Sequence, residues 1–149
     1  MPKADHILEI LDEARRAKWK LAVDEDTKAL KDPLRRLSFH VIDLQDGLTD
    51  DQLHRVLIKE GVDYLVTANG EDFIGYLESP VPSKKQYHVL WITKKLLADL
   101  ERAARAIETA IMYDLRVQKG APPAYVKITH KYITDREKLR KQARQSHKK

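Results

Sequence analysis

Short apolar runs that alternate with helical patterns constrain the fold of this chain more than any other feature. The runs are "WKLAV" (19–23), "FHVIDL" (39–44), "DYLVT" (63–67) and "HVLWIT" (88–93), and each is too short for a helix. Strands that are apolar along their whole length are typical of a parallel sheet covered by helices on both faces. The sequence therefore predicts an α/β fold of three layers, α/β/α, with a mostly parallel sheet of four to five strands.

The segments between these runs carry helix and loop signals. We expect Thr49 to cap one helix and Gly61 to end it, because threonine accepts from free amides and glycine adopts the left-handed conformation. Two prolines predict a loop over 78–86, and alternation over 124–133 predicts an edge strand. Thr134 is expected to cap the last helix. The expected helices cover 5–18, 27–37, 50–60, 94–118 and 134–145, with a helical turn at 73–77.

Length and composition predict one domain in a reducing compartment. The 149 residues form one expected unit over 1–133, followed by a basic C-terminal helix or tail over 134–149. No apolar run approaches the roughly 20 residues of a membrane span, and the N-terminus does not resemble a signal peptide. Cysteine is absent from the sequence, which excludes disulfides and thiolate metal sites. We therefore expect a cytoplasmic protein that does not enter a membrane.

The net charge of +5 is concentrated at the C-terminus. Residues 127–149 hold nine Lys or Arg and only two acidic residues. Such a segment attracts polyanions by releasing their counterions, which makes RNA or DNA a reasonable partner, although a solvated chain end explains it too. Tyr125 and Tyr132 interleave with these lysines, as expected either for base stacking or for an ordinary edge strand. The candidate nucleic-acid contacts are Lys127, Lys131, Arg136, Lys138, Arg140, Lys141 and Arg144.

Pairs of acidic residues follow the first three predicted strands. In an open parallel sheet, ligand sites lie beyond the carboxyl ends of the strands, near the point where the strand order reverses. Right-handed crossovers bring all three pairs to that one end of the sheet. The pairs are Asp24 with Glu25, Asp50 with Asp51, and Glu71 with Asp72.

Oxygen ligands without cysteine favour a hard divalent cation, Mg²⁺ or Mn²⁺. Such an ion suits phosphodiester hydrolysis, because it lowers the pKa of a bound water and offsets the charge of the leaving oxygen. A structural reading stays open for each acid taken alone. Asp50 lies in a first helical turn, where the helix dipole favours any carboxylate, and Asp24 and Asp26 could cap the next helix. Trp19 and Trp91, each in a predicted strand, are expected in the core rather than as stacking platforms.

The stretch from 21 to 73 resembles the PIN-like superfamily of metal-dependent ribonucleases, in particular its small toxin-like branch. The matching motifs are "VDED" (23–26), "FHVIDL" (39–44), "TDDQL" (49–53) and "TANGEDF" (67–73). The resemblance implies a PIN-like fold and endoribonuclease activity with Mg²⁺ or Mn²⁺. It also implies an RNA substrate and a place as the toxin of a toxin–antitoxin pair, with an antitoxin as partner.

By that resemblance, Asp24, Asp50 and Asp72 are the catalytic and metal-binding carboxylates. Glu25 and Asp51 are auxiliary metal ligands, and Glu71 is a supporting residue. Thr67 and Asn69 are expected to hydrogen-bond the carboxylates or a bound water. The apolar stripe of the 94–118 helix is expected to face the core, and a homodimer through this helix is the alternative that a fold this small allows.

Asn69 departs from the family pattern, because many members carry another aspartate there. An amide adds a neutral ligand and no charge, so a second hypothesis is a catalytically degraded domain of the same fold that binds nucleic acid or protein. A phospho-receiver domain is a third reading. It lacks support because the third strand ends in Thr67-Ala68-Asn69, without an aspartate to phosphorylate.

Overall fold

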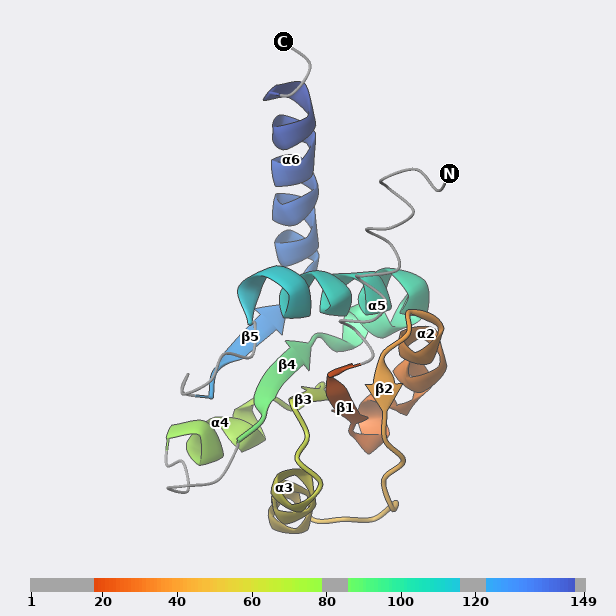
Figure 1. Ribbon diagram of the computed structural model, residues 1–149, viewed down its shortest axis with the longest axis vertical. Coiled ribbons are helices and arrows are strands. Elements are labelled where there is room, and N and C mark those ends of the chain that lie inside the picture. Colours follow the sequence, from red (N-terminus) through yellow and green to blue (C-terminus); the bar gives the residue numbers. More distant parts are fainter. Residues whose placement is uncertain (1–17, 79–85, 116–122, 147–149) are drawn as a thin grey trace.

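The sheet is parallel throughout, as the apolar runs predict (Figure 1). The computed structural model describes residues 18–78, 86–115 and 123–146. The strands lie in the order β2-β1-β3-β4-β5, and each neighbouring pair is parallel. This confirms the predicted α/β class. The strands are β1 (Lys20–Val23), β2 (His40–Val41), β3 (Tyr64–Thr67), β4 (His88–Ile92) and β5 (Tyr125–Ile128).

Helices connect the strands and complete three layers. Within the described residues, no helix is both long enough and apolar enough to cross a bilayer. The 3-10 helices are η1 (Glu25–Leu30) and η2 (Lys94–Ala98), and η3 (Ala110–Asp114) is a π-helical turn. The α-helices are α2 (Lys31–Arg36), α3 (Asp50–Lys59), α4 (Glu71–Glu78), α5 (Leu100–Thr109) and α6 (His130–Ser146).

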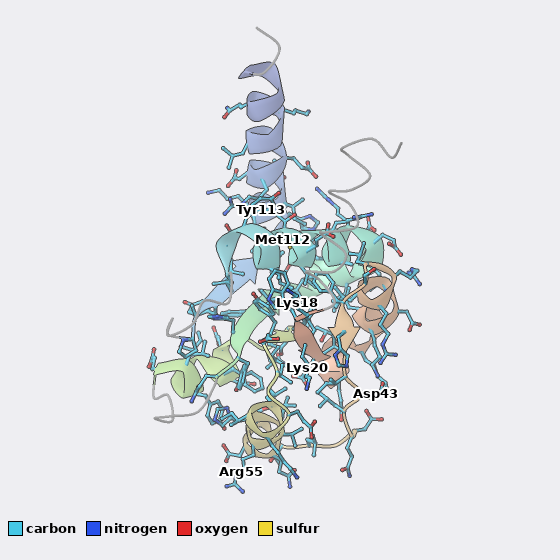
Figure 2. The ribbon with its side chains drawn as sticks, viewed as in Figure 1. Lys18, Lys20, Asp43, Arg55, Met112 and Tyr113 are labelled. Carbon is cyan, nitrogen blue, oxygen red and sulfur yellow. The ribbon has the colours of Figure 1, made fainter. Side chains whose placement is uncertain are left out.

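The three central strands, β1, β3 and β4, send alternate side chains to two separate cores. Leu21 and Val23 of β1 join the core under η1, α2 and α5, whereas Ala22 joins the core under α3 and α4. Figure 2 shows Met112 and Tyr113 of η3 at the base of α6, and Arg55 of α3 at the far end of the view. Strands buried on both faces explain why the apolar runs show no alternation.

Several local signals act as the sequence predicts. The Thr49 hydroxyl accepts from the Gln52 amide at 3.2 Å, and the Gln52 side chain accepts from the Thr49 amide at 2.9 Å. This capping box starts α3 one residue after Thr49. Gly61 has a positive φ of 65° just beyond the helix end, the conformation in which glycine costs least. These two residues set the length of α3.

The first two connecting segments depart from the expected boundaries. The predicted 39–44 strand is reduced to His40–Val41, although the Ile42 amide still donates to the Leu21 carbonyl at 2.9 Å. The chain then leaves this edge of the sheet, and Asp43 pairs with basic side chains of α2. The predicted 27–37 helix begins earlier, as η1, and becomes α-helical at Lys31.

The C-terminal third departs further. The predicted 94–118 helix breaks at Asp99, whose side chain accepts from the Arg102 amide and starts α5 anew. The predicted 124–133 strand ends at Ile128. Thr129, not Thr134, caps the last helix, because its hydroxyl accepts from the Tyr132 amide at 3.1 Å.

Helix α6 therefore begins four residues before the expected start, and the boundary expected after residue 133 falls inside it. Ile133 is buried in the core beside α5, while Figure 1 shows the rest of α6 extending away from the sheet. Residues 5–17 of the expected 5–18 helix, residues 79–85 of the expected loop and residues 116–118 of the expected 94–118 helix lie outside the described residues.

Gly70 lies against Trp91, and Gly75 in α4 serves as its control, because open space surrounds it. A Cβ at Gly70 would lie 2.3 Å from Trp91 Cγ, whereas a Cβ at Gly75 of α4 meets nothing within 4 Å. We expect Gly70→Ala to lower the free energy of unfolding by about 1–3 kcal/mol through overpacking. Gly75→Ala should raise it by about 0.8–1.0 kcal/mol through helix propensity. Urea denaturation measures both, and equal effects would contradict the close approach.

Candidate functional site

The site lies where the strand order reverses. The chain passes from β1 to β2 on one side and then returns to place β3 on the other side of β1. The Asp24 amide, just past β1, donates to the Val66 carbonyl of β3 at 3.0 Å. Ligands of open α/β sheets bind beyond the carboxyl ends of strands at such a reversal. The topology thus puts Asp24 and the residues after Val66 at the position where a ligand is expected.

Hydrogen bonds fix the carboxylate of Asp24. One oxygen accepts from the Glu25 amide at 2.8 Å, which also caps η1. The other accepts from the Thr67 hydroxyl at 3.1 Å, and that hydroxyl accepts from the Asn69 amide at 3.0 Å. Thr67 is fully buried, so its hydroxyl is held in one orientation. Thr67 therefore supports the Asp24 carboxylate through a hydrogen bond.

Asp26 is an additional carboxylate of this site that the sequence reasoning left among the helix caps. Its Oδ2 accepts from the Asn69 side-chain amide at 2.8 Å. Burial raises the pKa of Asp26, and the nearby Asp24 charge raises it further. The motif "VDED" contained the signal, because Asp26 lies one turn of η1 from the end of β1. The side-chain amide of Asn69 thus donates its hydrogen bond to a carboxylate of the site.

Asp50 and Asp72 reach the same region from the first turns of α3 and α4. Burial raises the pKa of Asp50, and the charges of Asp72 and then of Asp24 raise it further. Like charges raise a carboxyl pKa only when they are near enough to repel it. Three strand-end segments distant in sequence therefore place Asp24, Asp50 and Asp72 within one shared electrostatic field.

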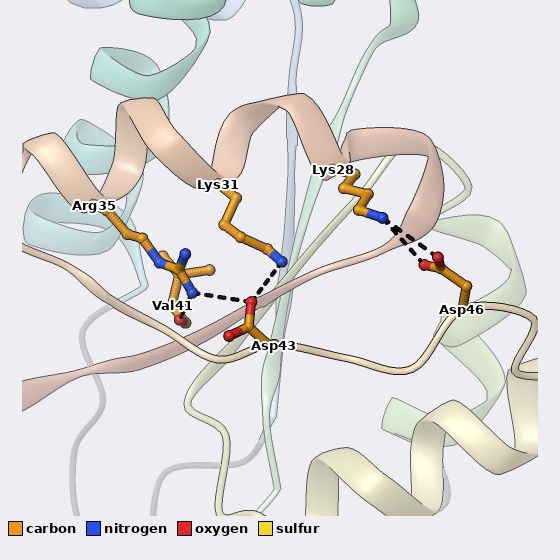
Figure 3. Close-up of polar contacts among 6 residues, drawn as sticks. All are labelled: Lys28, Lys31, Arg35, Val41, Asp43 and Asp46. Carbon is orange, nitrogen blue, oxygen red and sulfur yellow. Dashed lines mark hydrogen bonds and ion pairs between the residues drawn. The ribbon is translucent and has the colours of Figure 1, made fainter.

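Ion pairs hold the segment that precedes α3 in place (Figure 3). Asp43 contacts the Lys31 ammonium at 2.7 Å and the Arg35 guanidinium at 3.2 Å, and the two cations lower the pKa of Asp43. Asp46 pairs with Lys28 of η1 at 3.4 Å. These contacts join the 42–48 segment to the elements that follow Asp24. A shallow pocket lies between them, lined by Val23, Asp24, Glu25, Lys28, Lys31, Leu44, Gln45, Asp46, Leu48 and Leu53.

A cluster of aromatic side chains, missed at the sequence level, fixes α3 against α4. His54 Nδ1 lies 2.6 Å from the Tyr87 hydroxyl, and the His54 ring stacks on Tyr76 with centroids 4.1 Å apart. The Tyr76 hydroxyl donates to Asp51, and this bond raises the pKa of Tyr76 to about 12. Burial lowers the pKa of His54, whereas the nearby Asp51 charge acts in the opposite direction. Only the fold brings these residues together.

The auxiliary acids have partners of their own. The Glu25 carboxylate accepts from the Gly47 amide, and the Asp51 carboxylate is bonded to Tyr76. Glu71 is exposed in the first turn of α4 beside Asp72. Of the predicted residues, the structure therefore groups Asp24, Asp50 and Asp72 electrostatically, with Thr67 and Asn69 beneath them.

The donor chemistry of this group suits a hard divalent cation. The oxygens belong to carboxylates, a hydroxyl and an amide, the ligand types that Mg²⁺ and Mn²⁺ prefer. Across the part of the chain that the structure describes, however, no three His, Asp or Glu side chains stand in an arrangement that would hold a metal as they are. Asp50 and Asp72 are exposed, so their side chains are the ones that would close on an ion.

The predicted basic residues occupy β5 and α6. Lys127 lies on β5, and Lys131, Arg136, Lys138 and Lys141 lie on α6. Arg140 and Arg144 belong to the same helix. Arg136 pairs with Asp114 at 2.6 Å, and the Tyr132 hydroxyl also donates to Asp114. Tyr132 is thus a helical residue engaged by Asp114, not a strand residue open for base stacking.

Comparison of the chain with family models, with curated proteins and with solved structures gives no match to any of them.

The repulsion among the acids has a measurable consequence. We expect Asp72→Asn to lower the pKa of Asp50, and Asp51→Asn to lower it less, since Asp51 contributes the least. A raised carboxyl pKa means that the folded state gains stability relative to the unfolded chain as the pH falls through that pKa. Carboxyl ¹³C chemical shifts followed by NMR through the acid range report the pKa. If Asp72→Asn left the pKa of Asp50 unchanged, the result would show that the two carboxylates do not interact.

Proposed function

We propose that this chain is a metal-dependent ribonuclease that hydrolyses RNA phosphodiester bonds at the group formed by Asp24, Asp50 and Asp72. The observation that carries the proposal is the carboxylate of Asp24, held by the Glu25 amide and the Thr67 hydroxyl where the strand order reverses, with Asp50 and Asp72 near it in the first turns of α3 and α4. Carboxylates that repel one another at a ligand-binding edge are favoured by a bound cation. The oxygen-only donor set supports Mg²⁺ or Mn²⁺.

The proposed metal-binding roles of the residues differ with how firmly each side chain is held. Asp24 is fixed by Thr67 and by the Glu25 amide, so it would be the principal ligand. Asp72 and Asp50 are exposed at helix starts and would complete the binding of the ion. When bound, such an ion supplies positive charge against the phosphate and lowers the pKa of a water ligand. Asp26 and Asn69 hold each other beside Asp24 and keep the 68–70 segment in place.

The wider setting is proposed from the family resemblance together with the charge distribution. We assign the chain to the PIN-like superfamily, with RNA brought to the site by the basic residues of β5 and α6. A toxin paired with an antitoxin, and a homodimer, belong to the same proposal.

A second candidate function is a binding module of the same fold without catalysis. Two observations favour it. The described residues contain no ready set of three metal-binding side chains, and Asn69 replaces a charged ligand. Such a domain would keep the basic α6 for nucleic acid or protein and would not respond to metal.

Removing one carboxylate tests catalysis. Asp72→Asn should abolish Mn²⁺-dependent cleavage of single-stranded RNA, because a neutral amide in place of the carboxylate weakens binding of the metal ion and leaves the fold intact. Asp72 is exposed, so the substitution should change the free energy of unfolding very little. Glu78→Gln is the matched control, since it makes the same charge change at the other end of α4 and should cleave normally. Asp24→Asn should also be inactive. Full cleavage by both aspartate variants would overturn the assignment.

Metal binding separates the two candidate functions without an activity assay. A ligand selective for the folded state stabilises it by about 2.7 kcal/mol at 100 times its Kd. Millimolar Mn²⁺ should therefore raise the melting temperature of the parent protein by several degrees in scanning calorimetry, and this rise should vanish in Asp24→Asn. An unchanged melting temperature for the parent would favour the binding module.

A further inference from the structure

A row of four side chains crosses the carboxyl ends of four strands. Thr67 of β3 is in register with Trp91 of β4, and Trp91 with Lys127 of β5. Val23 pairs with Val66, so the next residue, Asp24, lies level with Thr67. The order across the sheet is therefore carboxylate, hydroxyl, indole and ammonium.

These four side chains share one face of the sheet. Residues in register on neighbouring parallel strands point to the same side. The contacts agree, because the Thr67 hydroxyl lies 3.1 Å from Asp24 Oδ2 and the Lys127 ammonium lies 4.3 Å from the centroid of the Trp91 ring. The same face carries α3 and α4, whose first turns supply Asp50 and Asp72. The row thus joins the acidic site to the edge strand β5.

Trp91 connects the acidic site to Lys127. The Gly70 backbone lies directly against the indole, since a Cβ there would fall 2.3 Å from Trp91 Cγ. Gly70 follows Asn69 and immediately precedes α4, so this contact sets the segment that presents Asp72. Trp91 is only partly buried and packs against the core under α3 and α4. The expectation that it is purely a core residue leaves out its second contact, with Lys127.

Lys127 keeps its charge available. Its side chain is exposed, and none of the ion pairs among the described residues includes it. A cation above an indole face is attracted by the ring and loses part of its rotational freedom, yet it keeps its hydrogen-bond donors. An ammonium held in this way is prepared to bind an anion.

We propose that Lys127, positioned by Trp91, is a phosphate-binding residue for the RNA strand that enters the acidic site. The identity of the ligand rests on the ribonuclease proposal above. Three strand spacings separate Asp24 from Lys127, about 14 Å between their α-carbons. One phosphate of a strand can then lie at the carboxylates while a neighbouring phosphate of the same strand meets Lys127.

Binding of an inert RNA tests Lys127 apart from catalysis. The probe is a fluorescent single-stranded 2′-O-methyl oligonucleotide in EDTA at low salt, and anisotropy gives the Kd. Lys127→Met keeps the aliphatic stem on the indole and should weaken binding about fivefold, with a salt slope smaller by about 0.7. Lys127→Arg should retain the affinity. Lys59→Met, the same change in the last turn of α3, is the control and should bind like the parent.

The role of Trp91 is tested by combining substitutions. Trp91→Phe keeps an aromatic face and should preserve binding, whereas Trp91→Leu should weaken it as much as Lys127→Met does. If Trp91 acts through Lys127, the double variant Trp91→Leu with Lys127→Met should be no weaker than either single one. Additive losses would show that Trp91 acts independently and would overturn the positioning role.

The outcomes distinguish this proposal from the ribonuclease assignment. Weaker binding by Lys127→Met in a protein that never cleaves RNA would keep the phosphate site and remove the nuclease. Active cleavage with Lys127→Met binding like Lys59→Met would keep the nuclease and overturn the role of Lys127.

Discussion

The pairing of β1 with β3 is the contact on which the candidate site depends. It brings the Asp24 amide to the Val66 carbonyl at 3.0 Å, and the Thr27 hydroxyl to the same carbonyl at 2.8 Å. One buried carbonyl thus fixes the start of η1 relative to the end of β3. The side-chain bond from Thr67 to Asp24 follows from this pairing, because it joins the next two residues in register. Without the crossover past β2, these two strand ends would not meet.

The fold offsets the repulsion that this arrangement creates. Asp50 and Asp72 lie in first helical turns, where the positive end of the helix dipole stabilises a carboxylate by about 0.3–1 kcal/mol. The Asp24 carboxylate accepts hydrogen bonds from the Glu25 amide and the Thr67 hydroxyl. Lys28 and Lys31 line the pocket beside it. A cluster of acids can therefore exist in the folded chain and still favour an added cation, as the raised pKa of Asp50 indicates.

Sequence patterns predicted what depends on neighbouring residues. The parallel sheet, the α3 cap at Thr49 and the end at Gly61 follow from local apolar runs and turn chemistry. Prediction failed at two kinds of place. The strand at 39–44 ends early, where Asp43 pairs with Lys31 and Arg35 of α2, a contact between segments that no local pattern encodes. The long helix breaks at Asp99, a local N-cap inside a continuous apolar stripe.

The residues of the site likewise include some that could be predicted from the sequence and some that could not. Asp24, Asp50 and Asp72 could be chosen because the topology of a parallel sheet sends all strand ends to one edge. The cluster of His54, Tyr76 and Tyr87, and the row through Trp91, depend on strand order and register, which no local pattern encodes. Asp26 is different, because it stood within a quoted motif and was read only as a helix cap.

The position of α6 relates the two charge distributions of the chain. Because β5 is parallel to its neighbours, it ends at the same edge of the sheet as β1 and β3, and α6 begins two residues later. The basic helix therefore starts at the edge that carries the acids and extends away from it (Figure 1). Under the proposed function, a cation would lie between the carboxylates, and phosphates of the same ligand would lie along the lysines and arginines. A polyanion with bound metal ions would contact both the carboxylates and the basic residues, whereas a lone anion or a lone cation would contact only one of these groups.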